Sequence, residues 1–199
     1  MSRAAAQSGL LRRQQAIDTL LELASELPPS QIRTAQISQR MGLSEAALFR
    51  HFPTKESLWF STLEHAIAFA WREVEKALDG LDDPLDAIHR LLVSQFNVNR
   101  TLPGMPALIF HELQKREPSL CRMIVINHLE RLRKHLLQLL TQAQCNAELS
   151  QQVSCQALAD TLLALMLGLL LQEQIRGGCP GESEAQLEAS LQQLLSAAR

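Results

Sequence analysis

Residues 34–58 read TAQISQRMGLSEAALFRHFPTKESL, and this stretch decides how the fold is interpreted. Thr34 is a natural N-cap for a short helix over residues 35–41, because its hydroxyl can accept a hydrogen bond from an unpaired backbone N–H. Gly42 ends that helix, since glycine readily adopts the left-handed conformation common at helix C-termini. Ser44 then caps another short helix. Two short helices joined by a glycine turn predict a helix-turn-helix, with an ordinary helical hairpin as the alternative.

Helical periodicity dominates the rest of the chain, and no alternating segment is long enough to indicate a sheet. The fold class is therefore predicted to be all-α, with about nine helices. A head over residues 1–54 is expected to precede a helical body over residues 55–199. The expected helices cover residues 10–27, 35–41, 45–51, 54–78, 84–99, 105–116, 118–144, 150–176 and 182–198.

Charge is distributed unevenly along the chain, although the net charge is only -2. Residues 1–55 hold seven Lys or Arg against four acids, whereas the remainder holds twelve against seventeen. A basic head on an acidic body indicates that only the head meets a polyanion. No run of about 18 apolar residues and no signal-peptide core are found, so we expect a cytoplasmic protein without a membrane partner.

The four cysteines, Cys121, Cys145, Cys155 and Cys179, form no C-x-x-C pair and have no nearby histidine at zinc-ligand spacing. Reduced structural thiols are expected, and a redox switch between two of them is the alternative. No nucleophile motif, phosphate-binding glycine loop or H-E-x-x-H segment is present either. We therefore expect no metal, no cofactor and no enzymatic activity.

The stretch over residues 34–58 closely resembles the DNA-binding signature of TetR-family transcriptional regulators. In that signature a Thr-capped helix, a Gly-hydrophobic-Ser turn and a Leu-aromatic-x-His-Phe ending precede a Ser/Thr-Lys-Glu start to the fourth helix. The resemblance is strong over the first third of the chain, and the remaining helices fit the family's ligand-binding and dimerisation body in outline. It implies a homodimeric regulator, most often a repressor, that leaves a pseudo-palindromic DNA operator when a small-molecule effector binds.

The resemblance also implies which residues contact DNA. Lys55 and Thr34 would hold phosphate, and Glu45 could accept a hydrogen bond from a cytosine amino group. His51 could donate to phosphate or be a packed core residue. Phe49 stands where the family usually has Tyr, so a phosphate-binding hydroxyl is missing. The predicted DNA-binding residues are Thr34, Ser44, Glu45, Ala46, Ala47, Phe49, Arg50, His51 and Lys55.

The segment ALADTLLALMLGLLL, residues 157–171, is apolar on every face apart from Asp160 and Thr161. Such a helix must be covered on all sides, and a partner subunit can supply part of that cover. A homodimer built by the last two helices is expected, and a monomer with a fully central helix is the alternative. The predicted interface residues are Leu162, Leu165, Met166, Leu169, Leu170, Leu187, Leu191, Leu194 and Leu195.

Mixed polar and apolar side chains at helical spacing in the body can line a ligand pocket, although they can equally form an ordinary core edge. The candidates are His65, Phe69, Arg72, Phe96, Arg100, Phe110, His111, Met123, Asn127, His128 and Arg131. An alternative function needs no such pocket. The segment SEAALFRHFPTK is also similar to that of the family's nucleoid-occlusion members, which indicates a DNA-bound structural adaptor that recruits a protein.

Overall fold

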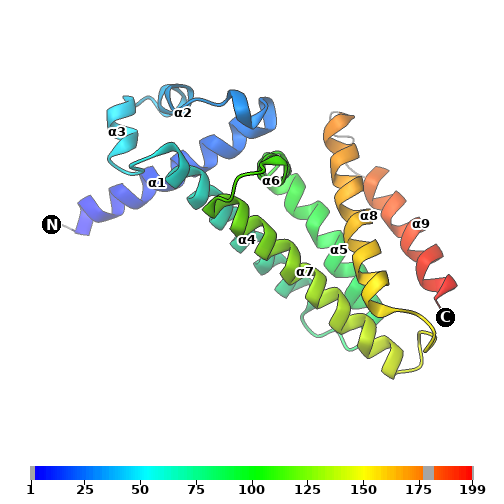
Figure 1. The fold of residues 1–199 in the computed structure, drawn as a ribbon. Helices are drawn as coiled ribbons and strands as arrows, with labels where there is room; N and C mark the ends of the chain where they lie inside the picture. The colour runs from blue at the N-terminus through cyan, green and yellow to red at the C-terminus, as the bar shows by residue number, and fades with distance from the viewer. Residues whose placement is uncertain (1–2, 177–181, 199) are drawn as a thin grey trace. The chain divides into compact units, whose positions relative to one another are not determined.

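The computed structural model describes residues 3–176 and 182–198, and its regular structure there is entirely helical (Figure 1). This confirms the predicted all-α fold. The elements are α1 (Arg3–Glu26), η1 (Pro29–Gln31), α2 (Thr34–Arg40), α3 (Glu45–Phe49), α4 (Lys55–Leu78), α5 (Pro84–Thr101), α6 (Met105–Gln114), α7 (Leu120–Cys145), α8 (Cys155–Ile175) and α9 (Glu182–Ala197).

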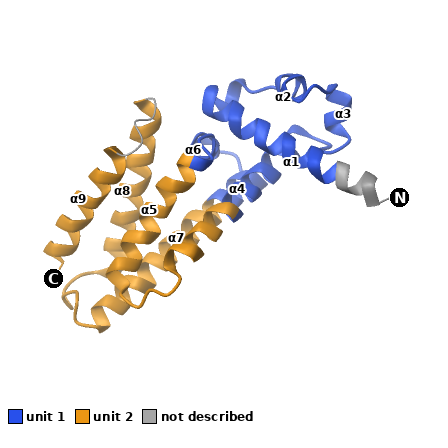
Figure 2. Cartoon of the chain, turned by 180° about the vertical axis from the view of Figure 1, so that it is seen from behind, with its two compact units in different colours: residues 1–68, 101–125 blue, residues 69–100, 126–199 orange. Residues whose placement is uncertain are grey.

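The chain divides into two compact units (Figure 2). Unit 1 comprises the described residues up to Ala68 together with Thr101–Val125, and therefore contains α1, α2, α3, the first part of α4, α6 and the start of α7. Unit 2 comprises Phe69–Arg100 and the described residues from Ile126 onward. The functional division after residue 54 stays a prediction, because packing units and functional domains need not share a boundary.

The helix-turn-helix region forms where the sequence places its start and stop signals. Gly42 has a φ of 66°, the left-handed value expected at the end of α2. The Ser44 hydroxyl accepts a hydrogen bond of 3.2 Å from the backbone N–H of Ala47, so Ser44 caps α3 as predicted. Ile37 and Leu48, one from each helix, are fully buried and hold the pair together.

The start of α2 differs from the sequence prediction, which made Thr34 the N-cap. Arg33 is the extended residue before the helix, and its backbone N–H donates to Gln36 Oε1 at 2.7 Å. Thr34 therefore lies in the first turn. Its hydroxyl is directed to another side chain rather than to the helix backbone.

The first helix also begins earlier than residue 10, at Arg3. Gly9 lies inside it, and one glycine costs a helix only about 1 kcal/mol relative to alanine. Leu10 lies on this helix with 69% of its surface exposed. The helix ends before Pro28, which cannot continue it.

Helix α6 approaches α1 closely inside unit 1. A Cβ added to Gly104 would lie 2.0 Å from the backbone oxygen of Leu21 and 3.0 Å from the Ala24 side chain. Only glycine fits at this contact, because a side-chain carbon would overlap the α1 backbone. The packing of these two helices therefore depends on one residue.

In unit 2, α8 packs beside α9 and begins at a Ser154 cap rather than at residue 150. By length and composition α8 could cross a membrane, as could core helices of many soluble proteins. About a third of it is buried, including Leu162, Met166 and Leu169. The rest of α8 is therefore not fully covered by the described part of the chain.

Candidate nucleic-acid interface

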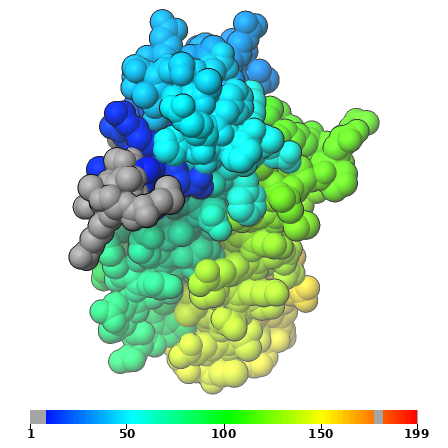
Figure 3. All heavy atoms as spheres, turned by 90° about the vertical axis from the view of Figure 1, so that its left-hand side faces the viewer, coloured from blue at the N-terminus to red at the C-terminus, as the bar shows by residue number. Residues whose placement is uncertain are grey.

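The predicted DNA-binding residues lie on α2, α3 and the first turn of α4, all in unit 1. Figure 3 shows the segment that contains α3 on the surface of this unit. Three of the side chains, Thr34, Ala47 and His51, are half-buried. The exposed members are Ser44, Glu45, Ala46, Phe49, Arg50 and Lys55. The structure thus presents the start of α3 to solvent, while the roles of these residues on DNA stay predictions.

Thr34 and Glu45 are joined directly. The Thr34 hydroxyl donates a 2.7 Å hydrogen bond to Glu45 Oε2, between the first residue of α2 and the first residue of α3. Thr34, predicted to contact phosphate, and Glu45, predicted to contact a base, are therefore already hydrogen-bonded to each other without DNA. The second carboxylate oxygen of Glu45 can still accept from another group.

Lys55 is held in place before any ligand binds. Its ammonium donates to the backbone oxygen of Ile32 at 2.6 Å and lies 4.5 Å from the centre of the Trp59 ring. Burial, and secondly the nearby charge of Lys115, lower the pKa of Lys55 below its ordinary value. Because an ammonium carries three donors, two remain for another acceptor such as a phosphate. The lysine thus links the segment before α2 to the start of α4.

Arg13 is a part of this region that sequence reasoning missed. Its guanidinium stacks on the Phe52 ring at 4.2 Å, donates to the backbone oxygen of His51 and reaches Ser61 Oγ at 3.4 Å. It therefore fastens α1 to the end of α3. No sequence signal around Arg13 identifies His51 as its partner, because the two residues lie 38 positions apart in the chain.

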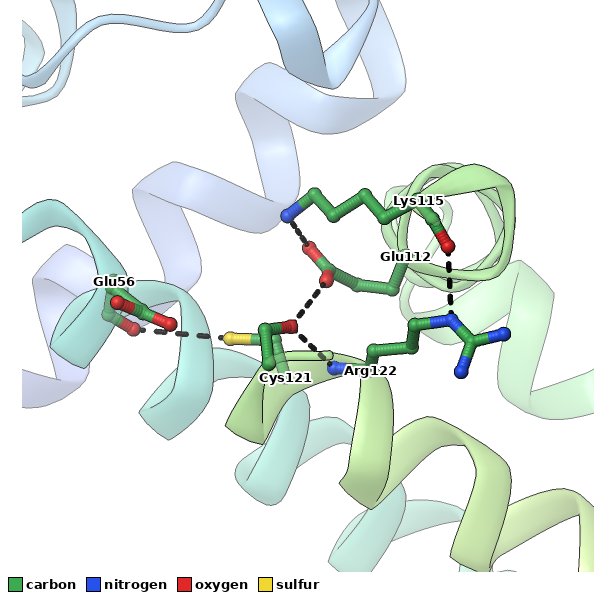
Figure 4. Close-up of polar contacts among 6 residues, drawn as sticks. Glu56, Glu112, Lys115, Cys121 and Arg122 are labelled. Atoms are coloured by element: carbon green, nitrogen blue, oxygen red, sulfur yellow. Dashed lines mark hydrogen bonds and ion pairs between the residues drawn. The ribbon is translucent and has the colours of Figure 1, made fainter. Parts of the chain in front are cut away.

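The junction of α6 and α7 in unit 1 is fixed by a polar cluster around the buried Glu112 (Figure 4). Glu112 is fully buried and pairs with Lys115 Nζ at 2.6 Å, and Ser119 Oγ approaches the other carboxylate oxygen at 3.4 Å. Arg122 Nε donates to the Lys115 backbone oxygen at 3.0 Å. Burial raises the pKa of the neighbouring Cys121 thiol to about 11, so this cysteine is unreactive.

The other cysteines differ in how exposed their thiols are. Cys145 is exposed, Cys155 is half-buried, and Cys121, Cys145 and Cys155 are all free. Cys179 lies outside the described residues. The choice between structural thiols and a redox switch therefore stays open for pairs formed among Cys145, Cys155 and Cys179.

The predicted pocket residues are distributed over both units. Several already have partners: His65 lies 3.4 Å from Gln14, Arg100 pairs with Glu184, and Arg131 stacks on Trp71 at 3.7 Å. Phe96 and His128 are buried; Phe69, Phe110 and His111 are half-buried; Arg72, Met123 and Asn127 are exposed. His65, Phe110, His111 and Met123 belong to unit 1, and Phe69, Arg72, Phe96, Arg100, Asn127, His128 and Arg131 belong to unit 2. Their role as one pocket stays a prediction.

The predicted interface residues on α8 and α9 are mostly covered by the chain itself. Leu165, Leu194 and Leu195 are half-buried. The buried members are Leu162, Met166, Leu169, Leu170, Leu187 and Leu191. These six side chains therefore pack within unit 2, and the role of the predicted residues at a dimer interface stays a prediction.

Comparison with known proteins identifies a family match over the segment that contains the helix-turn-helix. Residues 16–61 match the family described as bacterial regulatory proteins, tetR family. The nucleoid occlusion factor SlmA of Haemophilus influenzae (strain PittGG) is 30% identical over 110 residues, which cover 52% of this chain and 50% of that protein. The matched segment thus spans only half the length of this relative.

Solved structures share the whole fold at low sequence identity. A transcriptional regulator from Saccharomonospora viridis in complex with choline has a TM-score of 0.78 and 18% identity, covering 93% of this chain and 95% of that one. The regulator FadR from Bacillus subtilis in complex with stearoyl-CoA has a TM-score of 0.78 and 16% identity, covering 94% and 99%. The helix-turn-helix segment of this protein therefore matches the tetR family of bacterial regulatory proteins, and its fold is shared with these two structures along nearly the whole chain.

Proposed function

We propose that the protein is a homodimeric, sequence-specific DNA-binding regulator of transcription that works in the cytoplasm. In this proposal it acts as a repressor at a pseudo-palindromic operator and is released by a small-molecule effector. Two helix-turn-helix heads in a dimer contact half-sites about 34–36 Å apart, one turn of B-DNA. The proposal includes no catalytic step, in keeping with a family of regulatory proteins.

The observation that carries the proposal is the exposed start of α3, followed along the chain by the exposed cations Arg50 and Lys55. Ser44, Glu45 and Ala46 are exposed, and small side chains there allow a helix to approach the floor of the major groove. Arg50, at the end of α3, and Lys55, at the start of α4, carry positive charge that suits phosphate. Because Arg13 and the Lys55 contact brace the region from behind, it can meet DNA without first becoming ordered.

The test is selection of binding sites from a random DNA library, followed by affinity measurements at several salt concentrations. Arg50→Ala should weaken binding to all sequences and reduce the salt slope by about 1, because one phosphate contact is lost. Lys134→Ala is the matched control, since this exposed lysine lies on α7 in unit 2. Recovery of no enriched sequence, or equal loss in both variants, would contradict the proposal.

A face of α8 supports the proposed dimer. A stripe along the helix consists of small or apolar residues, and Gly168 has open space around its Cα. Leu171 and Ile175 continue the stripe with 42% and 75% of their surfaces exposed. Small side chains permit close helix packing, and a second copy would bury this face by two-fold symmetry. The stripe is Ala157, Thr161, Ala164, Gly168, Leu171 and Ile175.

Ala164→Arg should convert the dimer to a monomer with an unchanged helical spectrum, because a long cation cannot be buried in an apolar interface. Gln138→Arg on the exposed face of α7 is the control. Sedimentation equilibrium gives the mass of each variant. A dimer that survives Ala164→Arg would place the interface elsewhere.

The effector part of the proposal is supported by the two solved relatives of the fold that hold choline and stearoyl-CoA. In this chain α4 begins with Lys55 in unit 1 and continues into unit 2. A ligand that displaces the second half of α4 would therefore move Lys55. Operator affinity measured with and without an effector, and its reversal on effector removal, tests this coupling.

A second function is favoured by the similarity to the nucleoid occlusion factor of Haemophilus influenzae. In that alternative the protein is a DNA-bound adaptor whose body recruits another protein and needs no effector. Mapping the bound sites along the chromosome separates the two functions. One or two sites beside a neighbouring gene indicate a repressor, whereas many scattered sites indicate an adaptor.

A further inference from the structure

Unit 2 contains a largely buried carboxylate that has no cationic partner among the residues that the structure describes. Glu173, on α8, has only 8% of its surface exposed, and it forms no ion pair with any described residue. Acidic side chains are rarely this buried unless they are paired. Among the described residues Glu173 therefore lacks the cation that such a side chain usually has.

The side-chain amide of Asn99, next to Glu173, adds a second acceptor that lacks a hydrogen-bond donor. Asn99, on α5, donates from Nδ2 to Glu173 Oε2 at 2.9 Å, which directs its own carbonyl oxygen elsewhere. That Asn99 Oδ1 atom is buried and has no hydrogen-bond partner. The pair thus combines a negative charge with an unused neutral acceptor.

The nearest cation along α5 is committed to another acid. Arg100, the residue after Asn99, donates to Glu184 Oε2 at 2.5 Å. Asn99 Oδ1 is one of two buried side-chain atoms without a partner among the described residues, and the other, His128 Nδ1, also belongs to unit 2. Unmatched polar atoms are therefore confined to this unit in the described part of the chain.

We propose that Glu173 and Asn99 form a binding site for a small organic cation that carries N–H donors, such as a protonated amine or a guanidinium. A donor on the ligand satisfies Asn99 Oδ1, and its positive charge neutralises the Glu173 carboxylate through charge-assisted hydrogen bonds. A water molecule could satisfy the amide but would bring no positive charge to the carboxylate. An anionic ligand is disfavoured by the same carboxylate.

The site assigns a chemical class to the effector of the proposed function, and this assignment rests on the proposed function. Binding of the cation itself requires no DNA. A direct binding test on the full chain therefore separates the two ideas. If the cation binds and operator affinity does not change, the site stands and the effector role fails.

The test compares butylammonium chloride with butan-1-ol, a neutral molecule of similar shape, by thermal unfolding of the full chain at constant ionic strength. Choline chloride serves as a cation without N–H donors. A saturating primary ammonium should raise Tm by about 3 °C or more, since a ligand stabilises the state that binds it. Choline should raise it less and butan-1-ol not at all.

Two variants locate the effect. Glu173→Gln should abolish the response to butylammonium, whereas Glu182→Gln, at an exposed acid at the start of α9, should retain it. Without ligand, Glu173→Gln should unfold at a higher temperature than the wild type, because the uncompensated charge is gone. The proposal is overturned by no response to butylammonium, by an equal response to butan-1-ol, by a response that survives Glu173→Gln, or by destabilisation in that variant.

Discussion

Unit 1 and unit 2 differ in how completely their buried polar side-chain atoms are satisfied among the described residues, although unit 2 also contains satisfied groups such as the Ser94 hydroxyl, which donates to Leu91 O at 2.6 Å. In unit 1 the Ser38 hydroxyl donates to Ala35 O at 3.1 Å, the Thr62 hydroxyl donates to Leu58 O at 2.9 Å, and the Glu112 carboxylate pairs with a lysine. In unit 2 Asn99 Oδ1 and His128 Nδ1 have no partner. Because satisfied groups favour one rigid arrangement, unit 1 is suited to present a fixed surface. Unit 2 retains polar atoms that a ligand could satisfy.

The largest expected loss of stability in unit 1 comes from Gly104→Ala, which disrupts the contact between α1 and the start of α6. The new methyl group would overlap the Leu21 backbone, and the variant should lose about 3 kcal/mol or more of unfolding free energy. Urea denaturation measures the loss. Gly9→Ala is the control, because nothing lies near its position and the helix should gain up to about 1 kcal/mol. Equal stabilities of the two variants would refute the close α1–α6 contact.

A pH experiment tests the unmatched imidazole of unit 2. Burial lowers the pKa of His128 from 6.5 to about 4 in the folded protein. Between these values the unfolded chain binds the proton more readily, so stability falls as pH falls through this window. The loss should reach about 3 kcal/mol near pH 4. In His128→Phe this part of the loss should vanish in urea titrations at pH 7 and pH 4.5, and an unchanged loss would contradict the assignment.

Lys115→Met would create in unit 1 the kind of unpaired charge that unit 2 already contains. The Glu112 carboxylate would stay fully buried without its partner, which should cost about 2 kcal/mol, a reduced value because the lysine is partly exposed. Adding Glu112→Gln to that variant should restore part of the stability. The double-mutant cycle is read by chemical denaturation, and purely additive losses would mean that the two groups do not interact.

The smallest expected effect lies on the exposed surface of unit 1. Glu45→Gln removes a negative charge from the start of α3 and should strengthen binding to unrelated DNA while lowering discrimination among operator variants by about 1 kcal/mol. Thr34→Val removes the hydroxyl that holds Glu45 and should also lower discrimination. Thr34→Ser keeps the hydroxyl and serves as the control. Competition binding with single-base operator variants measures all three.

The local signals of the chain were sufficient for much of the fold. The alternation of apolar residues with a helical period, the Ser44 cap and Gly42 each act within a few residues, so the positions of α2 and α3 follow from the sequence. The box at the start of α4 is equally local, with Ser57 N donating to Thr54 Oγ1 at 3.0 Å and Thr54 N donating to Ser57 Oγ. The prediction for Thr34 was wrong because two adjacent residues could both precede α2, and the extended backbone falls at Arg33.

The all-helical fold and the basic helix-turn-helix near the start of the chain follow from the sequence alone, since periodicity, caps and turn residues act over short distances. The contacts between side chains that are far apart in the sequence became known only from the folded structure. Arg13 on Phe52, Lys55 on Ile32 and Asn99 on Glu173 are contacts of this kind. The partner of a charged or amide side chain cannot be predicted from its position in the sequence, because helix packing determines which side chains meet. The roles proposed for unit 2 depend on those contacts.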